Sequence, residues 1–268
     1  MNYLKTSLID KLGKSLKDLD NYRENPFIVF EKNNFLDKEE YLNLVDEIYI
    51  LNDFEKFSEG MGDKKKRSIH GSNIESLKNG IFKDFCNFFL SKEFYTWFKN
   101  THLPFFRKTS KYKIYILRPR NFFFRLIKKI FRVLKIPISF YFTEIEYSSI
   151  KRGGFIPPHT DSKNKRLSFV YYLLKDSNEI DDEQKKSLGT VFWKPAMTNK
   201  KILNRFDCAL LEGEEKKDFY KNYEPFYVAS YDQNKFVGFI KSDNTWHTVE
   251  PFNFNYDRRA IVINVYET

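Results

Sequence analysis

The second half of the chain consists of short β-type runs with no helical segment of comparable strength between them, and this pattern limits the fold more than any other feature. Polar breaks that contain glycine or asparagine separate the runs, which favours turns. Because a parallel sheet needs crossover helices between its strands, the pattern predicts an antiparallel sandwich or barrel preceded by helices. From residue 140 onward the runs are FYFTEIEYSS, RLSFVYYLL, GTVFWKP, KFVGFIKS, WHTVEPF and RRAIVINVY.

Helices are expected in the first half of the chain. The segment 35–51 places apolar side chains at helical spacing and offers Asp37 as an N-terminal cap. A second stretch, 74–100, contains an aromatic run with the spacing of a core-facing helix. The sequence therefore predicts a mainly β protein with N-terminal helices (α+β), in which a helical region, residues 1–137, packs on a β core, residues 138–268.

The composition is that of a folded protein that needs no disulfide or metal to hold it together. A length of 268 residues is sufficient for a sizeable core, and the two cysteines lie far apart with no CxxC pattern. No apolar run approaches the roughly 18 residues of a membrane span. Residues 1–25 lack the apolar region of a secretory signal, so the expected location is the cytoplasm.

The chain is basic, with 46 Lys and Arg against 36 Asp and Glu. Such an excess suits nucleic acid, an anionic membrane surface or an anionic substrate, but abundant lysine on solvated faces accounts for much of it, and nucleic acid is not the expected partner. The segment 121–137 is a candidate basic amphipathic helix. It could lie on a membrane surface, which would make the protein peripheral to the membrane, or pack its apolar stripe on the sheet, the alternative we favour.

Two histidines and an aspartate in the β-type half form a candidate metal site. His159 and Asp161 lie in PPHTD, and side chains two residues apart on an extended segment share a face. His247 lies in TWHTVEP, 88 residues later, so several antiparallel strands can return it beside His159. Two imidazoles and one carboxylate are the ligand set of non-haem Fe(II) oxygenases, although zinc could occupy the same ligands.

An arginine at the start of the last β-type run is a candidate carboxylate anchor. Arg258 follows His247 by eleven residues, and its guanidinium could bind the carboxylate of a cosubstrate held at the metal. Arg259 is its competitor. We prefer Arg258 because the small Ala260 on the same face leaves room for a ligand. The opposite face would then carry the bulkier apolar residues Ile261, Ile263 and Val265.

The chain resembles the Fe(II)/2-oxoglutarate-dependent dioxygenases, in particular their prolyl-4-hydroxylase-like branch. The resemblance covers about residues 140–268 and is carried, in order, by EYSSIKRGGFIPPHTD, RLSFVYYL, GTVFW, NKFVGFIKSDNTWHTVEP and RRAIVINV. It implies a double-stranded β-helix core, a jelly roll of the cupin type. It also implies an enzyme that uses Fe(II), 2-oxoglutarate and O2, with ascorbate as an optional addition, and that hydroxylates an unactivated C–H bond with release of succinate and CO2.

The resemblance assigns roles to six positions. Three would hold Fe(II), namely His159, Asp161 and His247, two would bind the distal carboxylate of 2-oxoglutarate, namely Arg258 and Tyr172, and Tyr147 would be a pocket tyrosine near the metal. In halogenating relatives a small residue takes the place of the metal-binding carboxylate, so the presence of Asp161 at that position favours hydroxylation.

The substrate is not inherited from the resemblance. The segment 196–230 is longer than a minimal member needs, and we expect it near the substrate mouth. A small molecule or a side chain would suit such a site. Lys165 and Arg166 follow the HxD motif closely enough to meet an anionic substrate, or they lie in a solvated loop.

Two functions of other classes stay open. A cupin-like module without catalysis would bind metal but would not turn over 2-oxoglutarate, and Arg258 argues against it. A peripheral membrane or nucleic-acid-binding protein would use the basic segment 121–137 as its functional surface.

Overall fold

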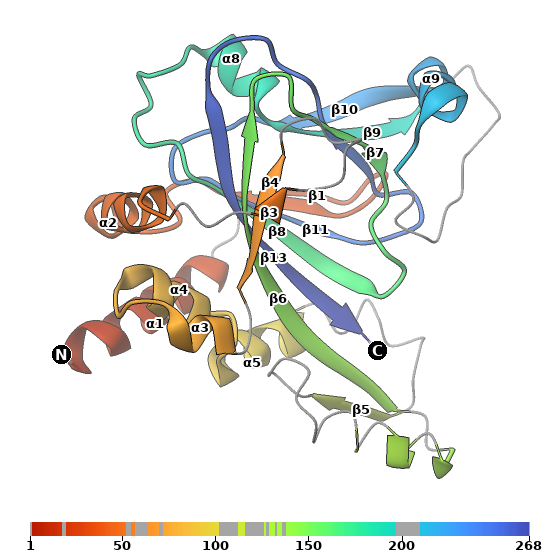
Figure 1. Cartoon of the computed structure of the whole chain (residues 1–268). Helices are drawn as coiled ribbons and strands as arrows, with labels where there is room; N and C mark the ends of the chain where they lie inside the picture. Colours follow the sequence, from red (N-terminus) through yellow and green to blue (C-terminus); the bar gives the residue numbers. More distant parts are fainter. Residues whose placement is uncertain are drawn as a thin grey trace.

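The computed structural model forms two β-sheets with a layer of N-terminal helices on one side (Figure 1). It describes residues 2–17, 20–51, 55–56, 64–69, 72–101, 112–115, 126, 129–131, 133–135, 138–196 and 210–267.

The strands and helices follow one another in an order that mixes both types in the first half. The strands are β1 (Asp20–Arg23), β2 (Val29–Lys32), β3 (Glu55–Lys56), β4 (Lys65–Ile69), β5 (Tyr112–Tyr115), β6 (Ile138–Lys151), β7 (Ile156–His159), β8 (Lys165–Tyr172), β9 (Thr190–Pro195), β10 (Tyr223–Ala229), β11 (Phe236–Ile240), β12 (Trp246–Val249) and β13 (Asp257–Glu267). The helices are α1 (Asn2–Lys17), α2 (Lys38–Tyr49), α3 (Ser72–Ser76), α4 (Ile81–Phe88), α5 (Lys92–Thr101), α8 (Asp182–Ser187) and α9 (Gly213–Asn222).

The topology is that of a double-stranded β-helix, as predicted. The larger sheet has the order β1-β2-β11-β8-β13-β6-β4-β3, with β5 added parallel to β6, and the smaller sheet has the order β10-β9-β12-β7. All other strand pairs are antiparallel. The long strand β13 pairs with β6 on one side and β8 on the other, so segments far apart in the sequence lie side by side.

The N-terminal region is not purely helical, and this corrects the prediction. Four of its segments, β1 to β4, add to the two edges of the larger sheet, through β2 on β11 and β4 on β6. These strands have two to five residues each, and charged residues are frequent in them (DNYR, VFEK, EK, KKRSI). Short edge strands of this kind lack the apolar alternation that identifies a strand in a sequence.

The predicted helices are present with changed limits. The segment 35–51 contains α2, whereas 74–100 is divided among α3, α4 and α5. The break between α4 and α5 falls at Ser91, whose side chain accepts a hydrogen bond from the backbone N–H of Phe94, as an N-terminal cap does. The charged stretch 175–187 ends in α8, which begins with a capping box between Asp181 and Gln184.

The helices cover the outer face of the larger sheet. The aromatic ring of Phe85 in α4 stacks on Tyr171 of β8 with centroids 5.4 Å apart. The hydroxyl of Tyr41 in α2 donates to the carbonyl of Leu174 at 2.6 Å. The outward residues of β13 belong to the same core, as expected: Ile261, Ile263 and Val265. A second apolar cluster joins residues of both sheets, including Tyr172 and Phe192.

Asn234 ties the N-terminal segment to the turn before β11. Its side-chain amide donates to Leu36 O at 2.6 Å and its side-chain oxygen accepts from Leu36 N at 3.0 Å. The same oxygen accepts from the hydroxyl of Tyr171 at 2.6 Å. Asn234 is buried and adopts a positive φ of 56°, a conformation that asparagine tolerates better than most residues.

Most of the segment 121–137 lies outside the described residues. The described residues of its predicted apolar stripe are exposed, namely Leu126, Ile130, Val133 and Leu134, whereas Phe131 is partly buried. The favoured alternative, in which the stripe packs on the sheet, is therefore wrong for these four side chains. Within the described ranges, no helix has both the length and the apolar character needed to cross a bilayer.

Candidate metal centre

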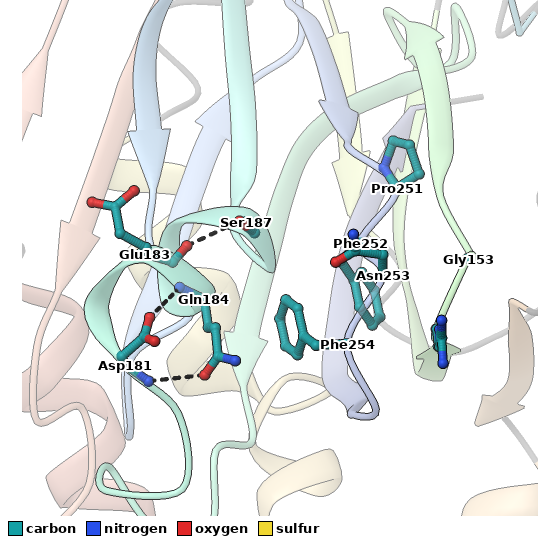
Figure 2. Close-up of a pocket in the computed structure, with 10 residues that line it drawn as sticks. Gly153, Asp181, Glu183, Gln184, Ser187, Pro251, Phe252, Asn253 and Phe254 are labelled. Atoms are coloured by element: carbon teal, nitrogen blue, oxygen red, sulfur yellow. Dashed lines mark hydrogen bonds between the residues drawn. The ribbon is translucent and has the colours of Figure 1, made fainter.

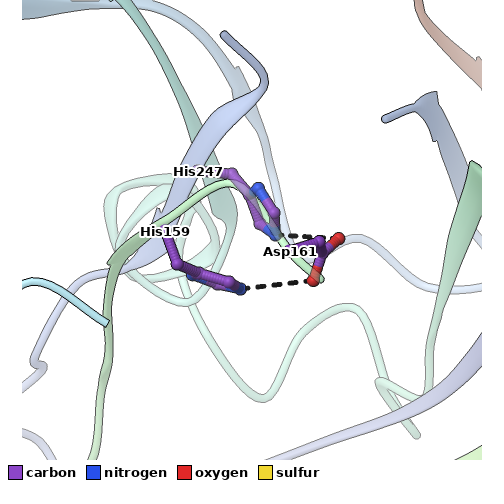
Figure 3. Close-up of side chains that lie close together, drawn as sticks. All are labelled: His159, Asp161 and His247. Carbon is purple, nitrogen blue, oxygen red and sulfur yellow. Dashed lines mark ion pairs between the residues drawn. The ribbon is translucent and has the colours of Figure 1, made fainter. Parts of the chain in front are cut away.

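His159, Asp161 and His247 meet where β7 and β12 of the smaller sheet run antiparallel (Figure 3). The two histidines are direct partners across these strands, and their ring centroids are 4.1 Å apart. One potential ligand atom from each of the three residues lies within 4.8 Å of the others. The structure thus brings together the three residues that the sequence singled out.

A turn at Asp161 directs its carboxylate between the two imidazoles. Strand β7 ends at His159, and Asp161 has a positive φ of 67°, so the extended segment expected for HxD is wrong. Its Oδ1 lies 3.6 Å from His159 Nε2 and its Oδ2 lies 3.8 Å from His247 Nε2. A positive φ is uncommon outside glycine, and strain of this kind persists where the surrounding structure enforces it, typically at functional sites.

Backbone carbonyls fix the orientation of both imidazoles. The Nδ1 of His159 donates to Pro157 O at 2.9 Å, and the Nδ1 of His247 donates to Thr245 O at 2.9 Å. Because a carbonyl can only accept, each Nδ1 carries a proton, and in a neutral imidazole with this tautomer the lone pair belongs to Nε2, the nitrogen on the side of Asp161. Burial, with the neighbouring His159, lowers the pKa of His247 to about 3, so its imidazole is neutral, the form that binds metal.

Three side chains contact or support the carboxylate of Asp161. The ammonium of Lys165 on β8 donates to Oδ1 at 2.7 Å. The hydroxyl of Ser168 lies 3.3 Å from Oδ2 and 3.0 Å from the side-chain oxygen of Asn264 on β13. Burial alone would raise the pKa of Asp161, but Lys165 and the two histidines hold it well below its usual value. The carboxylate is therefore ionised. Of the two basic residues after the motif, Lys165 lies at this site, whereas Arg166 pairs with Glu267.

The three residues open into a cavity of about 330 Å³ between the two sheets. Its wall includes Lys165, Arg258 and Thr190, and Leu210 from the segment 196–230. The volume is at the lower end of the range of small-molecule sites. Residues 197–209 of that segment lie outside the described part of the chain, so its expected role at the mouth stays a prediction.

Arg258 reaches this cavity and Arg259 does not. Arg258 is 2% exposed, and its Nε donates to Leu188 O at 2.5 Å. Its guanidinium carbon lies 5.4 Å from the ring centroid of Tyr172. Tyr172 is not among the described residues that line the cavity. Its hydroxyl accepts a hydrogen bond at 3.1 Å from the backbone N–H of Thr190, which does line it.

Tyr147 lies on the other side of the larger sheet, away from the metal ligands. Its neighbours on β6, Glu146 and Ser148, line the cavity, so strand alternation turns Tyr147 toward the helices. There its hydroxyl accepts from Arg259 at 3.1 Å. The assignment of Tyr147 as a pocket tyrosine is therefore not supported by its position.

Lys64 and Lys66 are among the cavity residues that the sequence did not indicate. They lie in the run DKKKRS, which has the composition of a solvated charged segment. This uniformly charged run gives no alternation that would separate an inward from an outward face, and the pairing of β4 with β6 cannot be inferred from it.

A wider hollow of about 710 Å³ lies elsewhere on the surface (Figure 2). Gly153, α8 and the residues that precede β13 line it. The side chains of Asp181 and Gln184 there hydrogen-bond reciprocally with each other's backbone N–H groups, as parts of a helix cap. The candidate metal ligands line the smaller cavity instead.

No protein-family model matches the chain, and no curated protein matches its sequence. Solved structures do match. A prolyl 4-hydroxylase from Phytophthora capsici has 14% identity and a TM-score of 0.52, over 98% of this chain and 65% of that one. A prolyl-4-hydroxylase from Pseudomonas putida has 12% identity and a TM-score of 0.44, over 95% and 98%. HygX from Streptomyces hygroscopicus, solved with nickel, 2-oxoglutarate and hygromycin B, has 10% identity and a TM-score of 0.45, over 89% and 82%. The chain has the double-stranded β-helix fold of the prolyl-4-hydroxylase-like 2-oxoglutarate/Fe(II) oxygenases.

Proposed function

We propose that the protein is an Fe(II)- and 2-oxoglutarate-dependent oxygenase whose metal is held by His159, Asp161 and His247. The observation that carries this proposal is the convergence of two imidazole Nε2 atoms and one ionised carboxylate within 4.8 Å. Backbone carbonyls hold both rings in the required tautomer, as the outer contacts of metal-bound histidines do. Two histidines and one carboxylate occupy one face of a metal and leave positions for a cosubstrate and O2.

Arg258 would bind the distal carboxylate of 2-oxoglutarate. It lines the same cavity as the three ligands and is buried, and a buried guanidinium is stabilised by an anionic partner. Leu188 O holds its Nε, which fixes the direction of the side chain. Tyr172 contributes through Thr190 and through packing beside the guanidinium.

When bound, the iron and 2-oxoglutarate supply oxidation of a C–H bond with release of succinate and CO2, and we propose that the outcome is hydroxylation. The chain orients the ligands, excludes water from the cavity and positions the target bond. The cavity suits a small molecule or a single side chain.

Anaerobic titration of the purified apoprotein with Fe(II) and then 2-oxoglutarate tests the proposal. The visible charge-transfer band of the chelate is expected with both ligands present, and it should be absent from His159→Ala. Lys217→Ala, an exposed change on α9, serves as the matched control and should retain the band. Metal binding without the band would indicate a cupin-like binding module instead, and absence of metal binding would overturn the assignment.

A further inference from the structure

Two lysines from the N-terminal region form part of the wall of the candidate active site. Strand β4 pairs with β6, and Lys66 is aligned with Ser148, which lines the cavity. Lys64 precedes Lys66 by two residues and lines the same cavity. The side chain of Lys64 is 9% exposed and that of Lys66 is 30% exposed, so Lys64 lies deeper.

One carboxylate lies between these two ammonium groups. Glu146 Oε1 is 3.4 Å from Lys64 Nζ, and Glu146 Oε2 is 3.6 Å from Lys66 Nζ. Burial lowers the pKa of Lys64, Glu146 opposes that effect, and the nearby Lys66 and Arg258 add to it. Glu146 therefore does not fully offset the cost of burying the Lys64 ammonium, and an added anion would stabilise the ammonium form further.

The charges around the cavity do not balance. The described residues that line it carry four positive and two negative charges, from Lys64, Lys66, Lys165 and Arg258 against Glu146 and Asp161. The Fe(II) dication and the 2-oxoglutarate dianion of the proposed function cancel each other. The loaded cavity therefore keeps an excess of positive charge among these residues, which is unfavourable in a largely buried space unless an anion enters.

We propose that the substrate of this oxygenase carries a negatively charged group, a carboxylate or a phosphate, and that Lys64 and Lys66 bind it. The inference rests on the proposed function, because it takes the metal and 2-oxoglutarate as bound. Arg258 is assigned to the cosubstrate and Lys165 contacts Asp161, which leaves Lys64 and Lys66 as the remaining cations among the described residues that line the cavity. Lys64 and Lys66 are positioned to recognise the substrate rather than to take part in the oxidation.

The test uses the whole protein loaded with Mn(II) and saturating 2-oxoglutarate, and inorganic phosphate as the probe. Bound Mn(II) is paramagnetic and broadens the phosphorus resonance of phosphate that binds in the same cavity. Saturable broadening is expected for the wild type. The apparent affinity should fall at least about tenfold in Lys64→Met/Lys66→Met, the loss of a charge-assisted contact.

Two further variants separate charge from folding. Lys64→Arg/Lys66→Arg keeps both charges and should retain phosphate binding. Lys186→Met/Lys217→Met removes one exposed lysine from α8 and one from α9, and this variant should behave as the wild type. If the methionine pair fails to fold, Lys66→Met alone, at the more exposed position, should still weaken binding.

The outcomes distinguish this inference from the proposed function. Electron paramagnetic resonance measures Mn(II) binding independently of phosphate, and absence of Mn(II) binding would contradict both proposals. Normal metal and 2-oxoglutarate binding without phosphate broadening would overturn the anionic-substrate inference alone. Equal broadening in the wild type and the methionine pair would overturn it as well, because phosphate would then bind elsewhere.

Discussion

Arg258 and Arg259 are neighbours in the chain, but their side chains lie on opposite faces of β13. Arg258 lines the cavity with the candidate metal ligands. The guanidinium carbon of Arg259 lies 4.0 Å from the ring centroid of Tyr49 in α2, and the same group donates to the hydroxyl of Tyr147. Strand alternation thus assigns one arginine to the ligand cavity and the other to the contact between helices and sheet.

Arg258→Met should weaken 2-oxoglutarate binding, whereas Arg259→Met should not. Loss of a charged hydrogen-bonding group on the cosubstrate should raise the dissociation constant by about ten- to a hundredfold. Arg259→Met should instead lower the free energy of unfolding by about 1 kcal/mol, through the lost contacts with Tyr49 and Tyr147. Titration of the Mn(II)-loaded protein and urea unfolding measure the two effects. The reverse pattern would make Arg259 the anchor.

Lys165→Met should increase metal affinity and destabilise the metal-free protein. The ammonium lies 2.7 Å from Asp161 Oδ1, so it repels a cation at the site and neutralises the carboxylate when no cation is bound. We expect Mn(II) to bind several-fold more tightly and the metal-free protein to lose about 1–3 kcal/mol of stability, because a buried carboxylate loses its partner. Lys165→Arg keeps the charge and is the control. Weaker Mn(II) binding by Lys165→Met would show that Lys165 supports the ligand geometry instead.

Asn234→Ala should destabilise the protein by removing the side-chain contacts of Asn234 with Leu36 and Tyr171. The change removes the partners of Leu36 N, Leu36 O and the hydroxyl of Tyr171, all buried, and should cost at least about 2–3 kcal/mol in urea unfolding. Asn234→Gly tolerates the positive φ but makes none of these hydrogen bonds, so it isolates their contribution. If Asn234→Gly were as stable as the wild type, the side-chain hydrogen bonds would contribute nothing, and only the positive φ would explain the asparagine at this position.

Gly238→Ala and Gly13→Ala should change stability in opposite directions. A Cβ at Gly238 would lie 2.1 Å from a ring carbon of Phe30, within the packed core, and should destabilise the protein by about 1–3 kcal/mol. A Cβ at Gly13, inside α1, meets nothing within 4 Å and should stabilise the helix by about 1 kcal/mol. Thermal unfolding of both variants checks the pair. A neutral Gly238→Ala would show that Phe30 can move away.

The candidate ligands could be predicted because the motifs that hold them are local. PPHTD and TWHTVEP each present a histidine in or beside a β-type run, and both histidines lie in the structure as direct partners across β7 and β12. The backbone conformation of Asp161 could not be predicted, since local residue patterns do not specify a positive φ for a residue other than glycine. The role of Tyr147 was implied by the resemblance alone. Its position depends on which residues of β6 face inward, and Glu146 and Ser148 line the cavity instead.

Local residue patterns were sufficient for most strands of the β core, for α2 and for the inward direction of Arg258, because alternation and helical spacing are properties of neighbouring residues. They did not indicate β10, which lies in the segment 196–230. Long-range pairing determined the rest. The strands β1 to β4 join the larger sheet because β2 pairs with β11 and β4 pairs with β6. Each of these pairs joins segments that are far apart in the sequence. The cavity wall formed by Lys64 and Lys66 follows from that pairing, since burial beside Glu146 and Arg258 depends on which strands become neighbours.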